Sequence, residues 1–232
     1  MNILIVVAHP DDEGLGAGGT IHRLVKAGHN VDCCILSGSV DARFQRPKTT
    51  ELHKDIEKAR KTLGYRNVVL GAFPNIQFNT VPHLHLVQFI EKHINAFSSQ
   101  VIFTHHPSDL NNDHTHTAHA CLAASRLWQR REGVPRLEEL YFMEIQSSTE
   151  WAFPGHNAPF EANTFVELSE SDVEAKIASV DAYRSVMRQA PHPRSRENMT
   201  ALARFRGSQA GYLYGEAFQR VFGGLKLIEK DV

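Results

Sequence analysis

Short apolar runs alternate with amphipathic stretches along the whole chain. The runs are typical of strands buried on both faces, and the stretches have the apolar spacing of helices that pack one face on a sheet. We predict strands at residues 2–8, 31–36, 67–70, 101–104, 140–145 and 164–168, and helices at 14–27, 48–63, 82–97, 113–131, 170–187 and 195–210. This alternation predicts an α/β fold, a Rossmann-like three-layer α/β/α arrangement around a mostly parallel sheet. We expect residues 1–232 to form one domain.

Overall composition excludes several classes of partner. The chain carries 25 Lys and Arg against 26 Asp and Glu, a net charge of −1, and it has no basic stripe, so we expect no nucleic-acid partner. Its N-terminal apolar run is far shorter than the roughly 20 residues that cross a bilayer. We therefore expect a cytoplasmic protein with no membrane partner, and reduced thiols at its three cysteines. A homo-oligomer is compatible with the sequence, which does not define the oligomeric state.

One histidine and three carboxylates cluster directly after the first predicted strand, in His9-Pro10-Asp11-Asp12-Glu13. Ligands of parallel sheets bind outside the carboxyl ends of the strands, so chemistry is expected here. One carboxylate, Asp12 or Glu13, could merely cap the following helix. Capping does not need a histidine and two aspartates, however, and we interpret His9 and Asp12 as metal ligands that leave Asp11 free to act as a base.

A second polar loop follows the strand predicted at 101–104 and runs from His105 to His114. Taken alone, it is also compatible with a solvated loop that contains incidental histidines. Catalytic zinc usually has three protein ligands drawn from histidine and carboxylate, with one position left open. A single histidine from this loop would complete a His/Asp/His set, and His105 and His106 compete with His114 for that position.

These residues match a known pattern. Residues 8–13, AHPDDE, resemble the signature of the PIG-L/LmbE-like N-deacetylases, and Asn111-x-Asp113-His114 resembles the family's second motif, HxDH. Residues 37–44 lie where the family has a substrate loop, and Arg206-Gly207 and residues 214–218 resemble its closing segment. The first motif is specific, whereas the second is weak unless it occurs with the first.

The resemblance implies a zinc-dependent hydrolase that removes an acetyl group from an N-acetylated small molecule, such as an N-acetylglucosamine-type sugar or a glycoconjugate precursor. It implies that His9, Asp12 and His114 bind the metal and that Asp11 is the general base for an activated water molecule. Asp113 would hold a ligand or a neighbouring catalytic side chain. The ligand types and the family together indicate zinc, although iron, cobalt and manganese also accept such a ligand set.

One position departs from the family pattern. Asn111 stands where the motif has a histidine; its amide can donate a hydrogen bond to an oxyanion but cannot act as a general acid. Asn111 and Tyr214 are therefore the predicted oxyanion donors. The group that protonates the leaving amine stays open among His106, His192 and Asp11.

Substrate contacts are less well defined by the sequence. Arg43 is a candidate for positioning the substrate. His192 and Arg194 lie in a Pro-rich turn that could form part of the rim of the substrate pocket. A purely structural turn with Ser195 as helix N-cap explains that segment equally well. We expect the loops at 37–47, 71–79 and 146–161 to form the pocket walls.

Two other functions compete with deacetylation. Some relatives of the family are hydratases of carboxylated substrates, for which Arg43 and Arg194 would be suitable contacts. Gly14-x-Gly16-x-x-Gly19 formally fits a dinucleotide-binding pattern. The acidic residue expected at the end of the second strand is absent, however, and HPDDE would repel a pyrophosphate, so we interpret these glycines as packing positions.

Overall fold

The computed structural model describes residues 1–153 and 158–224, and its centre is a seven-stranded sheet with the strand order β3-β2-β1-β4-β5-β7-β6. The strands are β1 (Asn2–Val7), β2 (Asn30–Ile35), β3 (Asn67–Leu70), β4 (Val101–His105), β5 (Glu139–Met143), β6 (Thr164–Leu168) and β7 (Tyr214–Gly223). β1 to β5 pair in parallel, and β7 lies antiparallel between β5 and β6. The predicted α/β fold with a mostly parallel sheet is confirmed.

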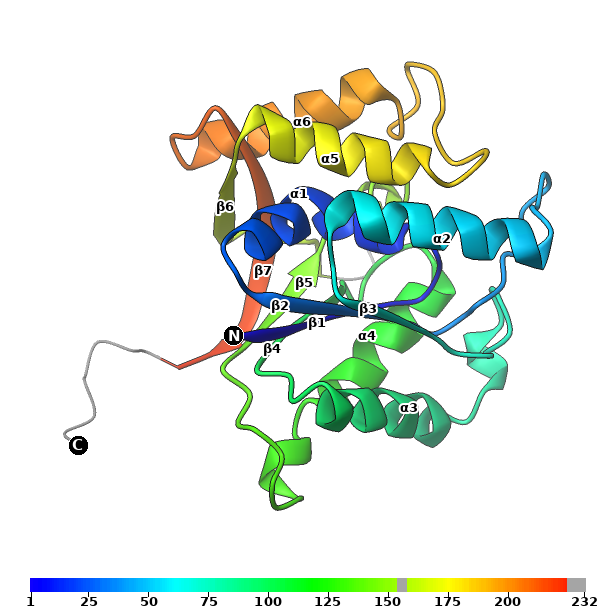
Figure 1. The fold of residues 1–232 in the computed structure, drawn as a ribbon, viewed down its shortest axis with the longest axis vertical. Coiled ribbons are helices and arrows are strands. Elements are labelled where there is room, and N and C mark those ends of the chain that lie inside the picture. The colour runs from blue at the N-terminus through cyan, green and yellow to red at the C-terminus, as the bar shows by residue number, and fades with distance from the viewer. Residues whose placement is uncertain (154–157, 225–232) are drawn as a thin grey trace.

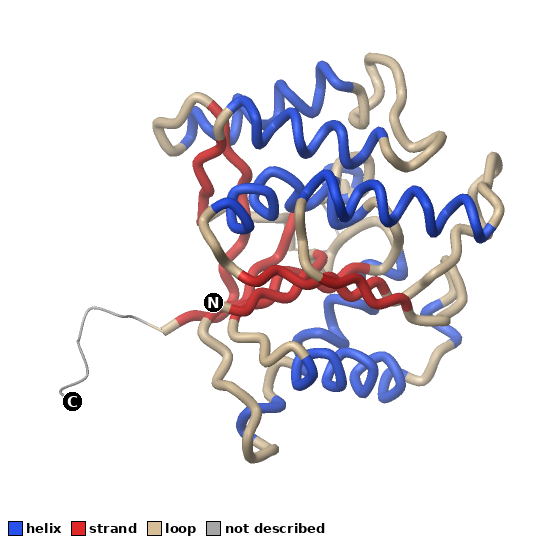
Figure 2. Tube along the Cα trace, viewed as in Figure 1, coloured by secondary structure: helices blue, strands red, loops and turns tan. Residues whose placement is uncertain are grey.

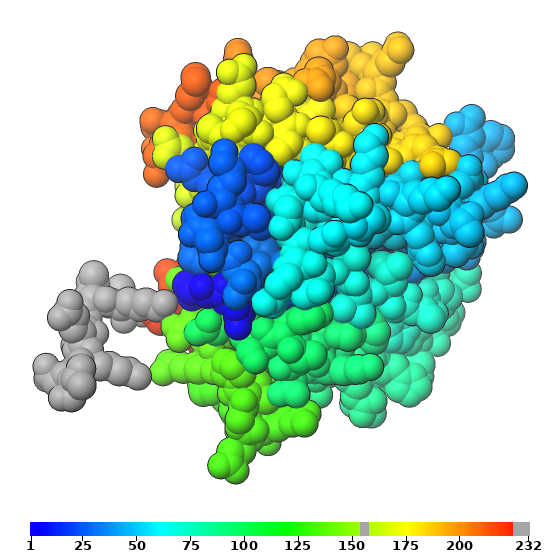
Figure 3. All heavy atoms as spheres, in the orientation of Figure 1, coloured from blue at the N-terminus to red at the C-terminus, as the bar shows by residue number. Residues whose placement is uncertain are grey.

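Helices cover both faces of this sheet (Figures 1 and 2). α1 (Asp12–Lys26), α2 (Thr49–Leu63), α5 (Glu170–Asp181) and α6 (Arg196–Gln209) lie on one face, and α3 (His83–Ala96) and α4 (Asn112–Ala124) lie on the other. Short 3-10 helices at Phe78–Thr80, Leu127–Gln129 and Thr149–Trp151 occur in the connections. The space-filling view shows α1, α2 and α5 packed side by side on the first face (Figure 3).

The apolar runs form the core because alternate side chains of each central strand point to opposite faces. Ile3, Ile5 and Val7 pack under α1 and α2, whereas Leu4 and Val6 pack under α3 and α4. All of these side chains are at most 3% exposed. Burying each of these side chains stabilises the fold by about 1.5–3 kcal/mol relative to leaving it exposed to water. Both faces of these central strands are covered by helices, so the strands carry apolar residues on both faces.

Two helix ends agree with the local sequence signals, and two others differ from the prediction. Ser195 is the N-cap of α6 and accepts a hydrogen bond from the amide of Asn198, as the turn interpretation of this segment predicts. α2 ends at Gly64, which has a φ of 81°, a conformation that favours glycine. α4 and α5 end earlier than predicted, at Ala124 and Asp181.

One strand was missed in the sequence. β7 is ten residues long and only its first half is buried, so it shows neither a continuous apolar run nor a simple alternation. In the sequence, this segment was identified only by its resemblance to a family motif.

The glycines at the start of α1 allow close packing. A Cβ at Gly16 would lie 2.7 Å from Ile145 Cδ1, and one at Gly19 would lie 2.5 Å from Leu168 Cδ1. These positions therefore bring α1 against its neighbours, as the packing interpretation predicts.

Within the described part of the chain, no helix combines the length and the apolar character needed to span a membrane.

Candidate active site

A cleft opens at the carboxyl ends of β1 and β4, where the strand order reverses. This is the topological switch point at which open α/β sheets bind their ligands. The cleft has a volume of about 270 Å³, and its lining comes from the loops after β1, β2, β3, β4 and β5 and from the turn before α6: His9, Asp11, Asp12, Ala42, Arg43, Asn75, Ile76, Asn111, His114, Ser147, Ser148 and Arg194. Residues from all three loops expected to form the walls are present.

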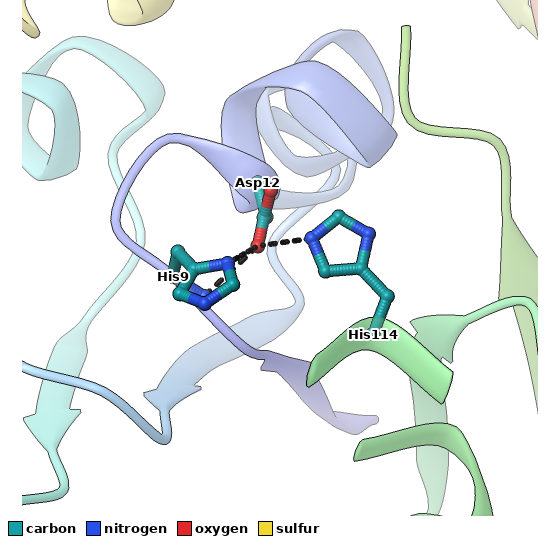
Figure 4. A group of neighbouring side chains, drawn as sticks. All are labelled: His9, Asp12 and His114. Carbon is teal, nitrogen blue, oxygen red and sulfur yellow. Dashed lines mark hydrogen bonds and ion pairs between the residues drawn. The ribbon is translucent and has the colours of Figure 1, made fainter. Parts of the chain in front are cut away.

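Three of the side chains that line this cleft point toward one another (Figure 4). His9 comes from the loop after β1, Asp12 from the first turn of α1 and His114 from the first turn of α4. One ligand atom from each lies within 4.8 Å of the others, and all three side chains are buried. Asp12 Oδ2 is 3.3 Å from His114 Nε2 and 3.5 Å from His9 Nδ1. Two imidazoles and one carboxylate are a donor set suited to a divalent transition metal.

A second carboxylate fixes the orientation of His9. His9 Nε2 donates to Asp113 Oδ2 at 2.9 Å, and Nδ1 of the same ring faces Asp12. Asp113 also accepts hydrogen bonds from the backbone amides of Ile76 and Phe78. Asp113 thus lies in the supporting position that the sequence predicted for it, and it ties the loop after β3 to His9.

Asp109 forms an ion pair with His114, a contact that sequence reasoning missed. Its Oδ1 lies 3.1 Å from His114 Nδ1, so that Nε2 of the ring faces Asp12. Burial alone would lower the pKa of His114, but Asp12 and Asp109 outweigh it and raise the pKa to about 10. Burial likewise opposes ionisation of Asp109, yet His114 and the hydroxyls of Ser148 and Thr149 lower its pKa to about 2. Both side chains are therefore charged at neutral pH while no metal is bound.

His105 and His106, the competitors for the third ligand position, are otherwise engaged. His105 Nε2 accepts a hydrogen bond from the amide of Ala8 at 2.8 Å, so its lone pair is used. Burial lowers the pKa of His105 to about 3, and its ring stacks on His114 with 3.9 Å between centroids. His106 packs edge-on against Phe142 and Phe160 and does not line the cleft. The geometry favours His114.

Asp11 stands beside the three convergent side chains in a strained conformation. Its φ is 104°, in a region that non-glycine residues rarely adopt and that is often associated with functional sites. Glu13 accepts the Asp11 amide at 3.1 Å and is itself hydrogen-bonded by the buried hydroxyl of Tyr183. Arg43 Nη2 lies 2.8 Å and Arg194 Nη1 3.4 Å from Asp11 Oδ2. Burial raises the pKa of Asp11, although both arginines act against this rise.

The remaining predicted site residues divide into two groups. Asn111 lines the cleft, and its side-chain oxygen caps α4 by accepting the amide of Asp113 at 2.9 Å. Tyr214 is not brought to the cleft: its ring lies under Arg204, whose Nη2 is 3.4 Å from the tyrosine hydroxyl. His192 also lies outside the lining, with its ring edge-on to Trp151. The expectation of an oxyanion donor at Tyr214 is therefore corrected, because β7 lies two strands away from β4 in the sheet and places this ring beside α6.

Comparison with known proteins identifies the family. Residues 4–125 match the family model PIG-L, described as GlcNAc-PI de-N-acetylase. The chain belongs to this family. The matched segment includes both loops that supply the convergent side chains, so the resemblance recognised in the two motifs is confirmed. Membership supports an enzyme that hydrolyses amides.

Several solved structures share the fold of this PIG-L protein. It is similar to the conserved protein TT1542 from Thermus thermophilus, with 25% identity over 98% of this chain and 97% of that one, and a TM-score of 0.78. N,N'-diacetylchitobiose deacetylase from Pyrococcus horikoshii is 17% identical, over 94% and 83% of the chains, with a TM-score of 0.70. GalB, the 4-carboxy-2-hydroxymuconate hydratase from Pseudomonas putida, is 18% identical, over 99% and 100%, with a TM-score of 0.74. The fold is thus shared by a deacetylase and a hydratase.

Asp109 could have been found by one further rule. Histidines that bind metals usually donate their second nitrogen to a carboxylate or carbonyl group, so two histidine ligands require two such partners. The sequence offers Asp109 and Asp113 close to His114. It does not say which aspartate serves which histidine, because His9 meets Asp113 across 104 residues of chain.

Proposed function

We propose that this PIG-L protein is a zinc-dependent N-deacetylase that hydrolyses the acetamide of a small molecule, an N-acetylglucosamine-type sugar or glycoconjugate precursor. The observation that carries the proposal is the convergence of His9, Asp12 and His114 in the same cleft as the carboxylate of Asp11. A purely structural cluster would have no use for a strained, buried aspartate that faces a cleft.

In this proposal His9, Asp12 and His114 hold the metal, which when bound supplies a Lewis acid for water and for the acetyl carbonyl. Asp11 takes a proton from the attacking water. Both arginine contacts fall on Oδ2 of Asp11, so we assign the proton transfer to Oδ1. Arg43 and Arg194 keep this side chain in place by holding its other oxygen.

Asp11 is also the group that we assign to protonation of the leaving amine. Of the three candidates, His106 and His192 do not line the cleft, whereas Asp11 does. Burial raises the pKa of Asp11 and so favours a carboxyl that can hold a proton between the two steps. Asn111, whose oxygen is used in capping α4, still has an amide Nδ2 to donate to the oxyanion.

The direct test is an assay of amine and acetate release from a panel of N-acetylated sugars. Protein stripped with a chelator and then restored with zinc should regain turnover, while the stripped protein should have none. Metal-dependent acetate release supports the proposal. No release from any sugar, with zinc bound at one equivalent, would contradict it.

A metal-dependent hydratase is the second candidate. The observation in its favour is the pair of guanidinium groups, Arg43 and Arg194, at the edge of the cleft, which suits a carboxylated substrate. Water addition to an unsaturated dicarboxylate, measured as the loss of the ultraviolet absorbance of this substrate, would support this function. Acetate release would instead support deacetylation.

A further inference from the structure

A second cavity adjoins the metal cleft. It has a volume of about 410 Å³ and is lined by Arg43, Phe44, Gln45, Ser185, Val186, Arg188 and Arg194. We call this cavity the arginine annex. Arg43 and Arg194 line both the annex and the cleft, so the two spaces are neighbours.

The walls of the annex come from two distant parts of the chain. One wall is the loop between β2 and α2, and the other is the connection from α5 to α6; in Figure 1 both lie on the same side of the molecule, beyond the carboxyl ends of the strands. Ser185 joins the two walls, since its hydroxyl is 3.4 Å from the side-chain oxygen of Gln45. The annex is therefore a product of the tertiary fold and not of one loop.

The charge of the annex is strongly one-sided. Three of its seven lining residues are arginines, and none is acidic. Among the described residues, Asp11 is the carboxylate that pairs with Arg43 and with Arg194. A chain with a net charge of −1 thus gathers three positive charges around one negative charge. The pKa of the neighbouring His192 is lowered, mainly by burial and to a smaller extent by the positive charges of Arg194 and Arg188. The contribution of the two arginines agrees with this excess of positive charge.

Arg188 is the arginine whose charge has no counter-ion. Among the described residues, its guanidinium contacts only the backbone carbonyls of Ser185 and Met187, both through Nη1. Its other N–H groups remain available. Arg194 differs, because its Nε donates to Ser147 at 2.5 Å and its Nη1 faces Asp11. Arg188 can therefore approach an added anion without breaking an ion pair, while Arg43 and Arg194 border the same space.

We propose that the arginine annex binds an oxyanionic group of the substrate, a phosphate or a carboxylate, while the acetamide lies in the metal cleft. Guanidinium groups recognise both anions through paired, charge-assisted hydrogen bonds. This inference rests on the proposed deacetylation and narrows its substrate class to acidic N-acetylated sugars. Neutral sugars would leave the annex empty and would be poor substrates.

The experiment compares three probes: N-acetylglucosamine, N-acetylglucosamine 1-phosphate and N-acetylmuramic acid, which carries a carboxylate. Acetate release from each is measured with the zinc-loaded wild type and with Arg188→Gln. We expect the wild type to prefer at least one acidic probe, and Arg188→Gln to reduce that preference in kcat/KM about tenfold, mainly through KM. The acidic probe that is preferred shows whether the anion is a phosphate or a carboxylate.

Arg131→Gln is the matched control, because Arg131 is also an exposed arginine with no carboxylate partner among the described residues and lies outside the annex. It should leave the preference unchanged. Equal use of neutral and acidic probes by the wild type, or an equal loss of preference in both variants, would overturn the inference.

Calorimetric titration of the zinc-loaded protein with the same probes separates this inference from the proposed function. Binding of an acidic probe that Arg188→Gln weakens, without acetate release, supports the annex and contradicts deacetylation. Acetate release with no preference for acidic probes supports deacetylation and contradicts the annex.

Discussion

Two buried clusters of charged side chains meet at α1, and they differ in how completely they are satisfied. Near the middle of the helix, Lys176 Nζ lies 2.7 Å from Glu216 Oε1 and donates to the carbonyl of Leu15 at 2.8 Å. Glu216 in turn accepts the amides of Gly19 and Thr20, just after α1 departs from helical geometry at Ala17. At the start of the same helix, Asp12, His9 and His114 direct their ligand atoms at one another.

The contrast separates a structural cluster from a binding site. In the Lys176–Glu216 pair each charged group has its counter-ion and its hydrogen bonds, so the pair replaces the hydrogen bonds that the kink in α1 interrupts. In the cleft, nitrogen atoms of two imidazoles converge on one carboxylate, and a divalent cation could take up all three ligand atoms. Burial and charge alone would not have distinguished the two clusters.

Removing one of the convergent side chains should have the largest effect. We expect His114→Ala to lose the metal and to lose turnover down to background, because two protein ligands hold zinc far more weakly than three. Elemental analysis and the acetate assay measure the two losses. His116→Ala, on the same helix but outside the cleft lining, is the control and should retain both. Full zinc occupancy in His114→Ala would remove His114 from the ligand set.

Asp11→Asn should separate catalysis from metal binding. Loss of a positioned general base commonly lowers turnover by about 10²–10⁴-fold, while zinc content should remain that of the wild type. Asp181→Asn, an exposed aspartate at the end of α5, is the matched control. Wild-type turnover in Asp11→Asn would contradict the assignment of the base.

Breaking the Lys176–Glu216 pair should affect stability instead of chemistry. Lys176→Met leaves Glu216 buried without its counter-ion, at a cost of about 3–5 kcal/mol in the free energy of unfolding. Equilibrium urea unfolding measures this loss, and the double variant Lys176→Met/Glu216→Gln should recover part of it. Zinc stoichiometry per folded molecule should not change; a loss of zinc would show that the two clusters are coupled.

Asp109→Asn should weaken the metal site without abolishing it. Loss of a carboxylate that orients a histidine ligand typically reduces metal affinity about 10- to 100-fold. Competition with a chelator of known affinity measures this change, again with Asp181→Asn as control. Unaltered zinc affinity would mean that Asp109 serves the loop at Ser148 and Thr149 rather than His114.

The smallest effect is the pH dependence of zinc affinity. The carboxylates raise the pKa of His114 to about 10 against its burial, and only the neutral imidazole binds zinc. Below that pKa the proton must leave, so apparent affinity should rise with pH, by up to about tenfold per unit between pH 6.5 and 8. Asp109→Asn should flatten this slope, because the histidine would then lose its proton at lower pH. An affinity independent of pH would contradict the raised pKa.

Much of the site was predictable because it lies within short stretches of sequence. Residues 8–13 follow a buried strand immediately, so the carboxyl-edge rule and the family motif placed His9, Asp11 and Asp12 together. The family motif indicated His114 as the third ligand, and the structure gives the physical reason why His105 is not, since His105 Nε2 accepts the amide of Ala8. The prediction for Tyr214 was wrong because β7 was not recognised as a strand. A sequence motif alone does not say toward which part of the molecule a side chain points. That the chain forms one domain stays a prediction.

The sequence by itself determined the alternation of strands and helices, the family, and the side chains that converge in the cleft. These follow from periodicity and from local motifs, which involve residues close together in the chain. Only the tertiary structure decided that Asp109 supports His114, that two arginines hold Asp11, and that Arg188 faces the same cavity as Arg43 across 145 residues of chain. Such contacts depend on how distant loops meet at one sheet edge, which hydrophobic periodicity does not encode.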